Sequence, residues 1–177
     1  MKHLDVIIAG FGGQGILSCG RLLAYAGMLE GKHVSWLPSY GPEMRGGTAN
    51  CCVIISEEPV GSPILNSTQV LIVMNGPSLE KFEDMVVPDG IIITDSSLVL
   101  NKTKRLDVKV IEIPATQLAM DLNNSTFANI FLLGKLAKET GIVEISSFEE
   151  ALKKVLPVKK HDLIPQEMEV FKTGAEY

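Results

Sequence analysis

Three glycines near the start of the chain have the spacing of a phosphate-binding turn. Gly10, Gly12 and Gly15 form the pattern G-x-G-x-x-G, and Gly13 and Gln14 lie inside it. In such turns the first glycine permits the tight bend, the second permits a ligand to approach the backbone, and the third lets the next helix pack on the strand. Free N–H groups at the start of that helix attract an anion. The amide of Gln14 can bind a polar ligand or hold a neighbouring loop.

The same turn does not have the acidic residue that a dinucleotide site requires. That residue is expected about 20 positions later, at the end of the second strand, where it holds the ribose hydroxyls. Trp36, Leu37 and Pro38 occupy this place. Three interpretations stay open: bound NAD(P), which the missing acid disfavours, an anionic group of another ligand, and a purely structural turn.

The loop at residues 38–47 is the second candidate region. Its residues that could contact a ligand are Ser39, Tyr40, Arg45, Gly46 and Gly47. The guanidinium is a planar fork for phosphate or carboxylate, and paired glycines permit close approach of the backbone. Because ligands of open α/β sheets bind at the carboxyl ends of the strands, we expect this loop to lie near the glycine turn. The alternative is a structural or subunit-contact loop in which Arg45 pairs with Glu43.

Other chemistry-bearing residues do not form a known constellation. Cys19, Cys51 and Cys52 are too few for an iron–sulfur cluster or structural zinc, which generally takes four clustered ligands. Adjacent cysteines in a strand point to opposite faces, so we expect thiols in a reducing cytoplasm rather than a metal site. The sequence contains no Walker lysine, G-x-S-x-G or H-E-x-x-H. The remaining polar groups are interpreted as caps or turns (residues 95–97 and 124–126) and as solvated surface (Lys102, Lys104 and Arg105).

Alternating strands and helices position these residues. Apolar runs predict strands at residues 4–9, 33–37, 48–56, 70–74, 91–94 and 108–113. Helical spacing predicts helices from residue 16 to a stop near Gly31 and at 78–85, 116–122, 126–139 and 148–156. The last of these follows a capping box that begins at Ser147, and residues 88–90 are a turn signal. Residues 161–177 form one more helix or a frayed tail. The prediction is an α/β fold: a single Rossmann-like domain over residues 1–177, with a mostly parallel sheet and helices on both faces.

Length and charge restrict the function further. A chain of 177 residues has the length of one domain, so it is too short for a two-domain dehydrogenase. A net charge of −5 and an aromatic content of 6% argue against nucleic-acid binding. The apolar run that ends at Gly10 is far too short for a signal peptide or a membrane span, which favours a cytoplasmic protein without a membrane partner.

The glycine turn with Ile16, together with the loop at 38–47, resembles the gamma subunit of 2-oxoacid:ferredoxin oxidoreductases. Further matching positions are Ser62-Pro63, Ala128-Asn129-Ile130 and Leu133-Gly134, so the resemblance extends over about residues 5–156. The loop's Ser-Tyr-Gly-Pro-Glu form looks more like the 2-oxoglutarate type than the pyruvate or indolepyruvate type.

The resemblance implies a subunit that is not catalytic alone. Such complexes convert a 2-oxoacid to an acyl-CoA and reduce ferredoxin; thiamine diphosphate and [4Fe–4S] clusters would lie in the partner alpha and beta subunits, with a delta subunit also expected. The gamma chain would bind no cofactor by itself but help to bind coenzyme A (CoA), with phosphates at Gly12, Gly13 and Gly15 and near Arg45. Two alternatives stay open: a purely structural interaction subunit and a free-standing nucleotide-dependent oxidoreductase. Part of the apolar surface of the gamma chain would face other subunits, and in the isolated chain this surface could pair two copies.

Overall fold

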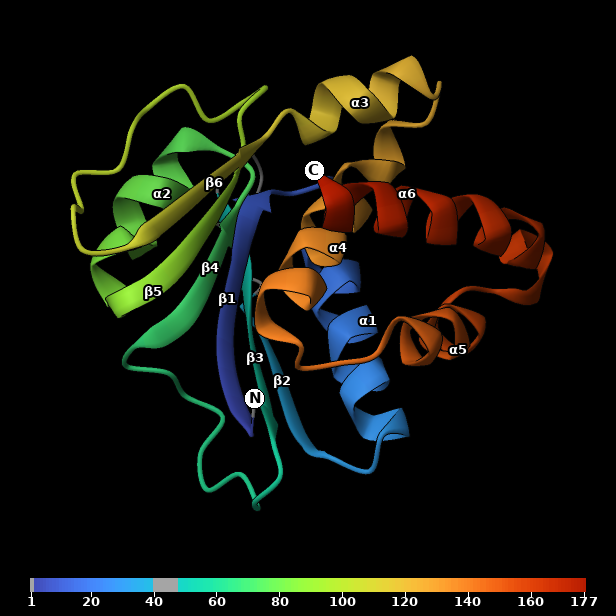
Figure 1. Cartoon of the computed structure of the whole chain (residues 1–177), viewed down its shortest axis with the longest axis horizontal. Helices are drawn as coiled ribbons and strands as arrows, with labels where there is room; N and C mark the ends of the chain where they lie inside the picture. The colour runs from blue at the N-terminus through green and yellow to red at the C-terminus, as the bar shows by residue number, and fades with distance from the viewer. Residues whose placement is uncertain (1, 40–47) are drawn as a thin grey trace.

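A computed structural model describes residues 2–39 and 48–177, and this part of the chain forms one six-stranded sheet with helices on both faces (Figure 1). The strands are β1 (His3–Phe11), β2 (His33–Ser39), β3 (Thr48–Ser56), β4 (Thr68–Val73), β5 (Val86–Asp95) and β6 (Lys109–Ile113). The helices are α1 (Ile16–Leu29), α2 (Gly76–Phe82), α3 (Ala115–Asp121), α4 (Ala128–Thr140), α5 (Ile145–Val155) and α6 (Ile164–Glu176), with short 3-10 helices at Glu83–Met85, Ser125–Phe127 and Val158–Leu163. The predicted α/β class is confirmed.

The sheet has the strand order β2-β3-β1-β4-β5-β6 and is mostly parallel. The pairs β1–β4, β4–β5 and β5–β6 are parallel, whereas β3 runs antiparallel to both β1 and β2. Strand β3 therefore separates β1 from β2, although β2 directly follows β1 and its helix along the chain. The sequence predicted each strand but not this insertion.

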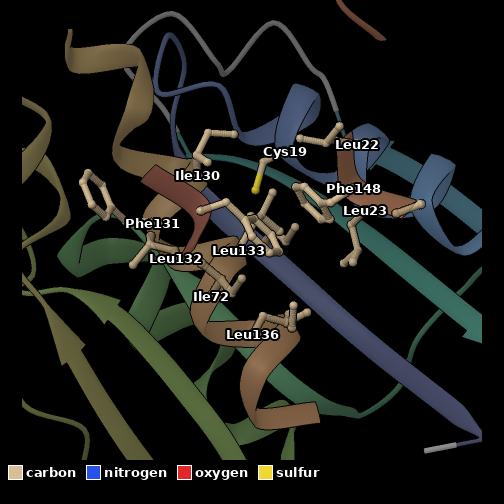
Figure 2. Close-up of a cluster of buried hydrophobic side chains, with 14 of the residues drawn as sticks. Cys19, Leu22, Leu23, Ile72, Ile130, Phe131, Leu132, Leu133, Leu136 and Phe148 are labelled. Carbon is tan, nitrogen blue, oxygen red and sulfur yellow. The ribbon is translucent and has the colours of Figure 1, made fainter. Parts of the chain in front are cut away.

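Two apolar clusters hold the helices to the sheet. Along β1, Val6 and Ile8 face the larger cluster, while Ile7 and Ala9 face the smaller one, as the period of two in a strand requires. The larger cluster packs α1, α4, α5 and α6 on one face, and its side chains from α1 and α4 meet around Cys19 (Figure 2). The smaller cluster packs α2 on the other face.

Helices α4 and α6 cross at two glycines. A Cβ atom at Gly134 would stand 2.0 Å from the carbonyl oxygen of Phe171, and one at Gly174 would stand 2.1 Å from that of Phe131. Neither position accepts a side chain without separating the helices. The C-terminal segment is therefore a packed helix rather than a frayed tail, and it covers α4 (Figure 1).

Helix α5 does not begin at the predicted capping box. It begins at Ile145, so Ser147 lies inside the first turn instead of preceding it, and the capping-box prediction is wrong. The cap comes from the end of α1: the Glu30 carboxylate accepts a hydrogen bond from the Glu144 N–H at 2.6 Å and from Lys32 Nζ at 2.8 Å. A partner 114 residues away in sequence thus sets where the helix starts.

The predicted turn at residues 88–90 lies within β5. Asp89 has φ = +63°, and its N–H donates to the Asp107 carbonyl at 2.8 Å. The pairing register between β4 and β5 shifts there, from Thr68 opposite Val86 to Val70 opposite Ile91. The turn residues therefore produce an irregularity in a continuous strand.

Candidate functional site

The glycine turn joins β1 to α1 at the carboxyl end of β1. Gly13 has φ = +92° and Gly15 has φ = +74°, both in the left-handed region that favours glycine. Gly15 is the residue that precedes the first turn of α1. Gly10 lies in β1, where a Cβ atom would stand 2.5 Å from Gln14 Oε1 and 2.7 Å from Ile16 Cδ1. The first glycine therefore makes room for side chains of the turn itself.

The side chain of Gln14 fixes the turn to the neighbouring strand end. Its Oε1 accepts a hydrogen bond from the Phe11 N–H at 2.6 Å, and its Nε2 donates to the Met74 carbonyl at 3.0 Å. Met74 directly follows β4, and its N–H donates to the Ala9 carbonyl at 2.9 Å. The Gln14 amide was predicted either to bind a polar ligand or to hold a neighbouring loop. These contacts show it holding a neighbouring segment.

Asn129, at the start of α4, contacts the glycine turn through its side chain. Its Nδ2 donates to the Gln14 carbonyl at 3.1 Å, and a Cβ atom at Gly15 would stand 2.3 Å from the same nitrogen. The third glycine, Gly15, thus makes room for a side chain of α4. The sequence had instead predicted that this glycine lets α1 pack on a strand. Asn129 was not among the predicted site residues, although it belongs to the Ala128-Asn129-Ile130 segment that carries the resemblance.

Free backbone donors face a hollow beside this turn. The hollow has a volume of about 270 Å³ and is lined by Phe11, Gly12, Gly13, Gly15, Ile16, Leu17, Ser18 and Ala49. Within the described residues, no acceptor meets the N–H groups of the first three residues of α1, Ile16 to Ser18. Among the described residues, no acidic side chain contributes to this lining. Unpaired N–H groups at a helix start with no carboxylate beside them suit an anion such as a phosphate.

The second candidate loop connects the end of β2 to the start of β3. Ser39, at the end of β2, pairs with Asn50, and Thr48 pairs with Phe11 next to the glycine turn. The chain therefore leaves and re-enters the sheet at the edge where the turn lies, as predicted. Tyr40, Arg45, Gly46 and Gly47 lie outside the described residues, so their predicted contacts remain predictions.

The end of β2 does not supply a ribose-binding acid. Its last residues are Leu37, Pro38 and Ser39, and β3 separates it from the glycine turn on β1. Because β3 lies between, the end of β2 is two strand spacings, roughly 10 Å, from β1. Both the residue types and the topology argue against the usual NAD geometry.

The cysteine side chains do not fit a metal cluster. Cys51 belongs to the larger apolar cluster, whereas Cys52 packs against the smaller one, which confirms that they face opposite sides of the sheet. Burial raises the pKa of the Cys51 thiol to about 12 and raises that of Cys19 well above its ordinary value. Within residues 2–39 and 48–177, no group of His, Cys, Asp and Glu side chains could hold a metal ion.

The other polar groups have structural partners. Asn124 caps the 3-10 helix before α4 through its Oδ1, and buried Asp95 accepts hydrogen bonds from the Thr116 N–H and hydroxyl at the start of α3. Arg105 departs from the prediction of solvated surface. Its guanidinium donates to the carbonyls of Glu83 and Val86 at 2.9 and 2.8 Å and bridges both carboxylate oxygens of Asp107 at 2.7 Å.

Comparison with known proteins supplies the family. A family model described as "Pyruvate ferredoxin/flavodoxin oxidoreductase" matches residues 5–177. The chain belongs to this family. Among relatives, the 2-oxoglutarate synthase subunit KorC of Methanocaldococcus jannaschii is 34% identical over 156 residues, which cover 86% of this chain and 83% of KorC. The ketoisovalerate oxidoreductase subunit VorA of Methanothermobacter thermautotrophicus is 42% identical over 177 residues, which cover 99% of this chain and 36% of VorA.

Solved structures of the family agree with the fold. The gamma subunit of a keto/oxoacid ferredoxin oxidoreductase from Geobacter sulfurreducens superimposes with a TM-score of 0.85 at 26% identity, over 99% of this chain and 96% of that one. A 2-oxoglutarate:ferredoxin oxidoreductase from Magnetococcus marinus gives a TM-score of 0.88 at 25% identity, over 99% of this chain and 31% of that one. The predicted resemblance to the gamma subunit is confirmed.

The chain spans about a third of the length of VorA and of the Magnetococcus marinus chain. In these family members the gamma unit is thus part of a longer polypeptide. Within the described residues of the chain itself, every helix is too short or too polar to cross a membrane.

Proposed function

We propose that this chain is the gamma component of a complex that oxidatively decarboxylates a 2-oxoacid. In that reaction the 2-oxoacid and CoA give an acyl-CoA, carbon dioxide and a proton, and two electrons pass to ferredoxin. The observation that supports this best is the family match over residues 5–177 together with the gamma-subunit fold. From the family resemblance, thiamine diphosphate and [4Fe–4S] clusters are assigned to partner components (alpha, beta and delta). For the clusters, the assignment is also supported by the three thiols of this chain, which do not fit a cluster. The free thiols also favour a cytoplasmic complex.

The substrate that we favour is 2-oxoglutarate. The loop at residues 38–47 has the form that resembles the 2-oxoglutarate type, and KorC is described as a 2-oxoglutarate synthase subunit. A branched-chain 2-oxoacid is the second candidate, because the identity to the ketoisovalerate subunit VorA is higher, at 42% against 34%. Copurification of the native complex through this chain, followed by assays of ferredoxin reduction with 2-oxoglutarate, 2-oxoisovalerate and pyruvate, tests both. A complex that reduces ferredoxin with none of these acids in the presence of CoA would contradict the proposal.

The role that we propose for this chain is to hold the phosphates of CoA at the glycine turn. The support is the hollow beside α1. In the described part of the chain, the N–H groups of Ile16 to Ser18 are free, no carboxylate lines the hollow, and a Cβ at Gly13 would meet nothing within 4 Å. The Magnetococcus marinus enzyme, which has this fold within its chain, was solved with CoA and succinyl-CoA bound. Arg45 is proposed to add its guanidinium to the same phosphates.

A pair of variants at one position tests the phosphate site. Asn and Asp are the side chains that best tolerate a positive φ, so Gly13→Asn and Gly13→Asp place nearly identical groups in the hollow and differ in charge. A carboxylate roughly 5 Å from a phosphate costs about 1–2 kcal/mol after screening by solvent. We therefore expect the complex with Gly13→Asp to bind CoA about tenfold more weakly than the complex with Gly13→Asn. Equal affinities of the two variants would contradict a phosphate at this turn.

Arg45 gives an independent test of the loop. Arg45→Ala in the assembled complex should raise the KM for CoA and leave the KM for the 2-oxoacid unchanged, because the loop is proposed to contact CoA alone. An unchanged KM for CoA in a complex that still assembles would remove Arg45 from the site. This result would favour the alternative in which the loop and the chain serve assembly only.

A further inference from the structure

A groove lies on the surface between α3 and α6 (Figure 1). Its volume is about 260 Å³, and its lining residues are Leu118, Asp121, Leu122, Phe131, Gln166, Glu169, Val170 and Thr173. On each wall these residues recur at intervals of three and four, so each helix presents one face to the groove. Phe131 and Val170, each 2% exposed, lie at its base, and Leu122, 44% exposed, lies at its edge.

The groove suits apolar side chains of a protein better than a small molecule. Its volume is below that of sites for drug-sized ligands, which are about 300–1,000 Å³. Its base is formed by aromatic and aliphatic carbon, and the Thr173 hydroxyl donates to the Glu169 carbonyl of its own helix at 2.9 Å. The base therefore offers contact area to an aliphatic anchor rather than polar groups that would orient a small ligand.

Two carboxylates, Asp121 and Glu169, stand on opposite walls of this groove, and both residues are exposed. Asp121 accepts a hydrogen bond from Gln117 Nε2 of its own helix at 2.8 Å. Within residues 2–39 and 48–177, no nitrogen of a Lys, Arg or His side chain lies within 4.0 Å of either carboxylate. A partner with an aliphatic anchor flanked by Lys or Arg would complement both the apolar base and the acidic rim.

The surface continues along α6 beyond this groove. Thr173 also lines a shallow depression whose other members are Lys172, Glu176 and Tyr177. Glu176 lies 3.7 Å from Lys138 Nζ, so the acidic charge without a cation is the pair at the groove itself. An elongated surface that follows a helix suits an amphipathic helix, which docks through apolar anchors spaced three and four residues apart.

One wall of the groove starts at the edge of the sheet where the glycine turn lies. Helix α3 begins at Ala115, directly after β6 ends at Ile113. Because β6, β5, β4 and β1 are parallel, α3 leaves the sheet at the same carboxyl edge as the turn. In the proposed function CoA reacts with an acyl group held by another component, so that component has to approach this edge.

We propose that the groove between α3 and α6 binds a helix of another component of the complex. Aliphatic side chains of that helix lie on the apolar base, and its Lys or Arg side chains lie beside Asp121 and Glu169. The inference rests on the proposed function, because this chain has such a partner only as part of a complex. It assigns the contact to residues that the glycine turn and the loop at 38–47 do not include.

Charge reversal tests the acidic rim. Asp121→Lys and Glu169→Lys, combined in one chain, remove two carboxylates that make no ion pair in the described structure, and a lysine at the end of α3 suits the helix dipole. Dilution of a fluorescently labelled complex gives the Kd of this chain for the other components. We expect the double variant to bind at least about tenfold more weakly, and the wild-type Kd to rise with salt. The matched control is Glu58→Lys, an exposed acid outside the groove, which should leave the Kd unchanged.

Two leucines with the same exposure test the apolar contact. Leu122 at the end of α3 and Leu29 at the end of α1 are each 44% exposed, and only Leu122 lines the groove. Leu122→Ser should weaken assembly by about tenfold, whereas Leu29→Ser should leave the Kd unchanged. Urea denaturation of the two isolated variants should give similar losses of stability, so the difference in assembly reports the contact.

Two results would overturn the docking site: assembly of the charge-reversed double variant with the Kd of the wild type, or equal effects of Leu122→Ser and Leu29→Ser on assembly. Sedimentation of the isolated chain tests a second copy as the occupant. A wild-type dimer that Leu122→Ser breaks, while assembly with the other components is unchanged, would replace the proposed partner by a second copy.

Failure of the docking site is distinguishable from failure of the proposed function. If copurification through this chain yields no other component, the proposed function fails and the docking site fails with it. If a complex is obtained that reduces ferredoxin, and the groove variants assemble like the wild type, only the docking site fails.

Discussion

Replacement of Gly15 by alanine tests how the glycine turn is held. The substitution adds one methyl group at a residue with φ = +74°, and its Cβ would stand 2.3 Å from Asn129 Nδ2. Gly31, at the other end of α1, also has φ = +74°, but a Cβ there would meet nothing within 4 Å. The two glycines therefore share the backbone strain and differ in the collision, so Gly31→Ala is the matched control.

The expected magnitudes follow from these contacts. A left-handed alanine costs about 1–2 kcal/mol, which is the whole effect expected for Gly31→Ala. At Gly15 the methyl group also displaces Asn129 and breaks its hydrogen bond to the Gln14 carbonyl, which adds about 1 kcal/mol. We therefore expect Gly15→Ala to lower the free energy of unfolding by about 2–3 kcal/mol. In the double variant Gly15→Ala/Asn129→Ala the collision is absent. Its loss of unfolding free energy should therefore be smaller than the sum of the losses in the two single variants.

Urea denaturation of the full chain, followed by circular dichroism, gives the four free energies of this cycle and that of Gly31→Ala. Equal losses for Gly15→Ala and Gly31→Ala would refute the argument, because the collision would then cost nothing. Strict additivity in the double variant would refute it as well, since Asn129 and the methyl group would not interact.

Three more substitutions test other parts of the fold. In Glu30, hydrogen bonds from Lys32, the Glu144 N–H and Ser147 outweigh burial and lower the pKa. Glu30→Gln should therefore lose about 1–2 kcal/mol at pH 7. Urea midpoints should show that loss shrinking as the pH falls below about 4.5, because the carboxyl of the unfolded chain takes up a proton there before that of the folded chain. Gly134→Ala should cost about 3 kcal/mol in thermal unfolding because it separates α4 from α6, whereas Gly61→Ala, in open space, should be nearly neutral. Arg105→Ala should cost about 2 kcal/mol and exposed Lys104→Ala almost nothing; equal costs would restore the solvated-surface interpretation.

Local patterns in the sequence predicted most of the elements, because the strand and helix signals there arise from neighbouring residues. The helix predicted to start at Ile16 and the strand predicted at residues 48–56 have those positions in the structure. The failures depend on partners that are distant in sequence. Helix α5 starts directly after Glu144, whose N–H donates to Glu30, and no pattern around Ser147 contains that information. The position of β3 between β1 and β2 is likewise a property of strand pairing.

In the candidate site, too, the features set by neighbouring residues could be predicted, and those set by residues distant in sequence could not. The positive φ of Gly13 and Gly15 and the free N–H groups of α1 follow from the glycine spacing itself. Asn129 enters from α4 and is brought to the turn by tertiary packing. An isolated asparagine in a helix has no local signature of such a role, so the spacing of the motif could not predict Asn129.

Hydrogen exchange of the assembled complex, with and without saturating CoA, tests the central claim most directly, because the proposed phosphate donors are backbone N–H groups. We predict that CoA slows exchange of the amides at residues 12–18, the glycine turn and first turn of α1. Amides at residues 27–32, at the other end of the same helix, should exchange at the same rate in both states. A complex that binds CoA and leaves exchange at residues 12–18 unchanged would contradict the account.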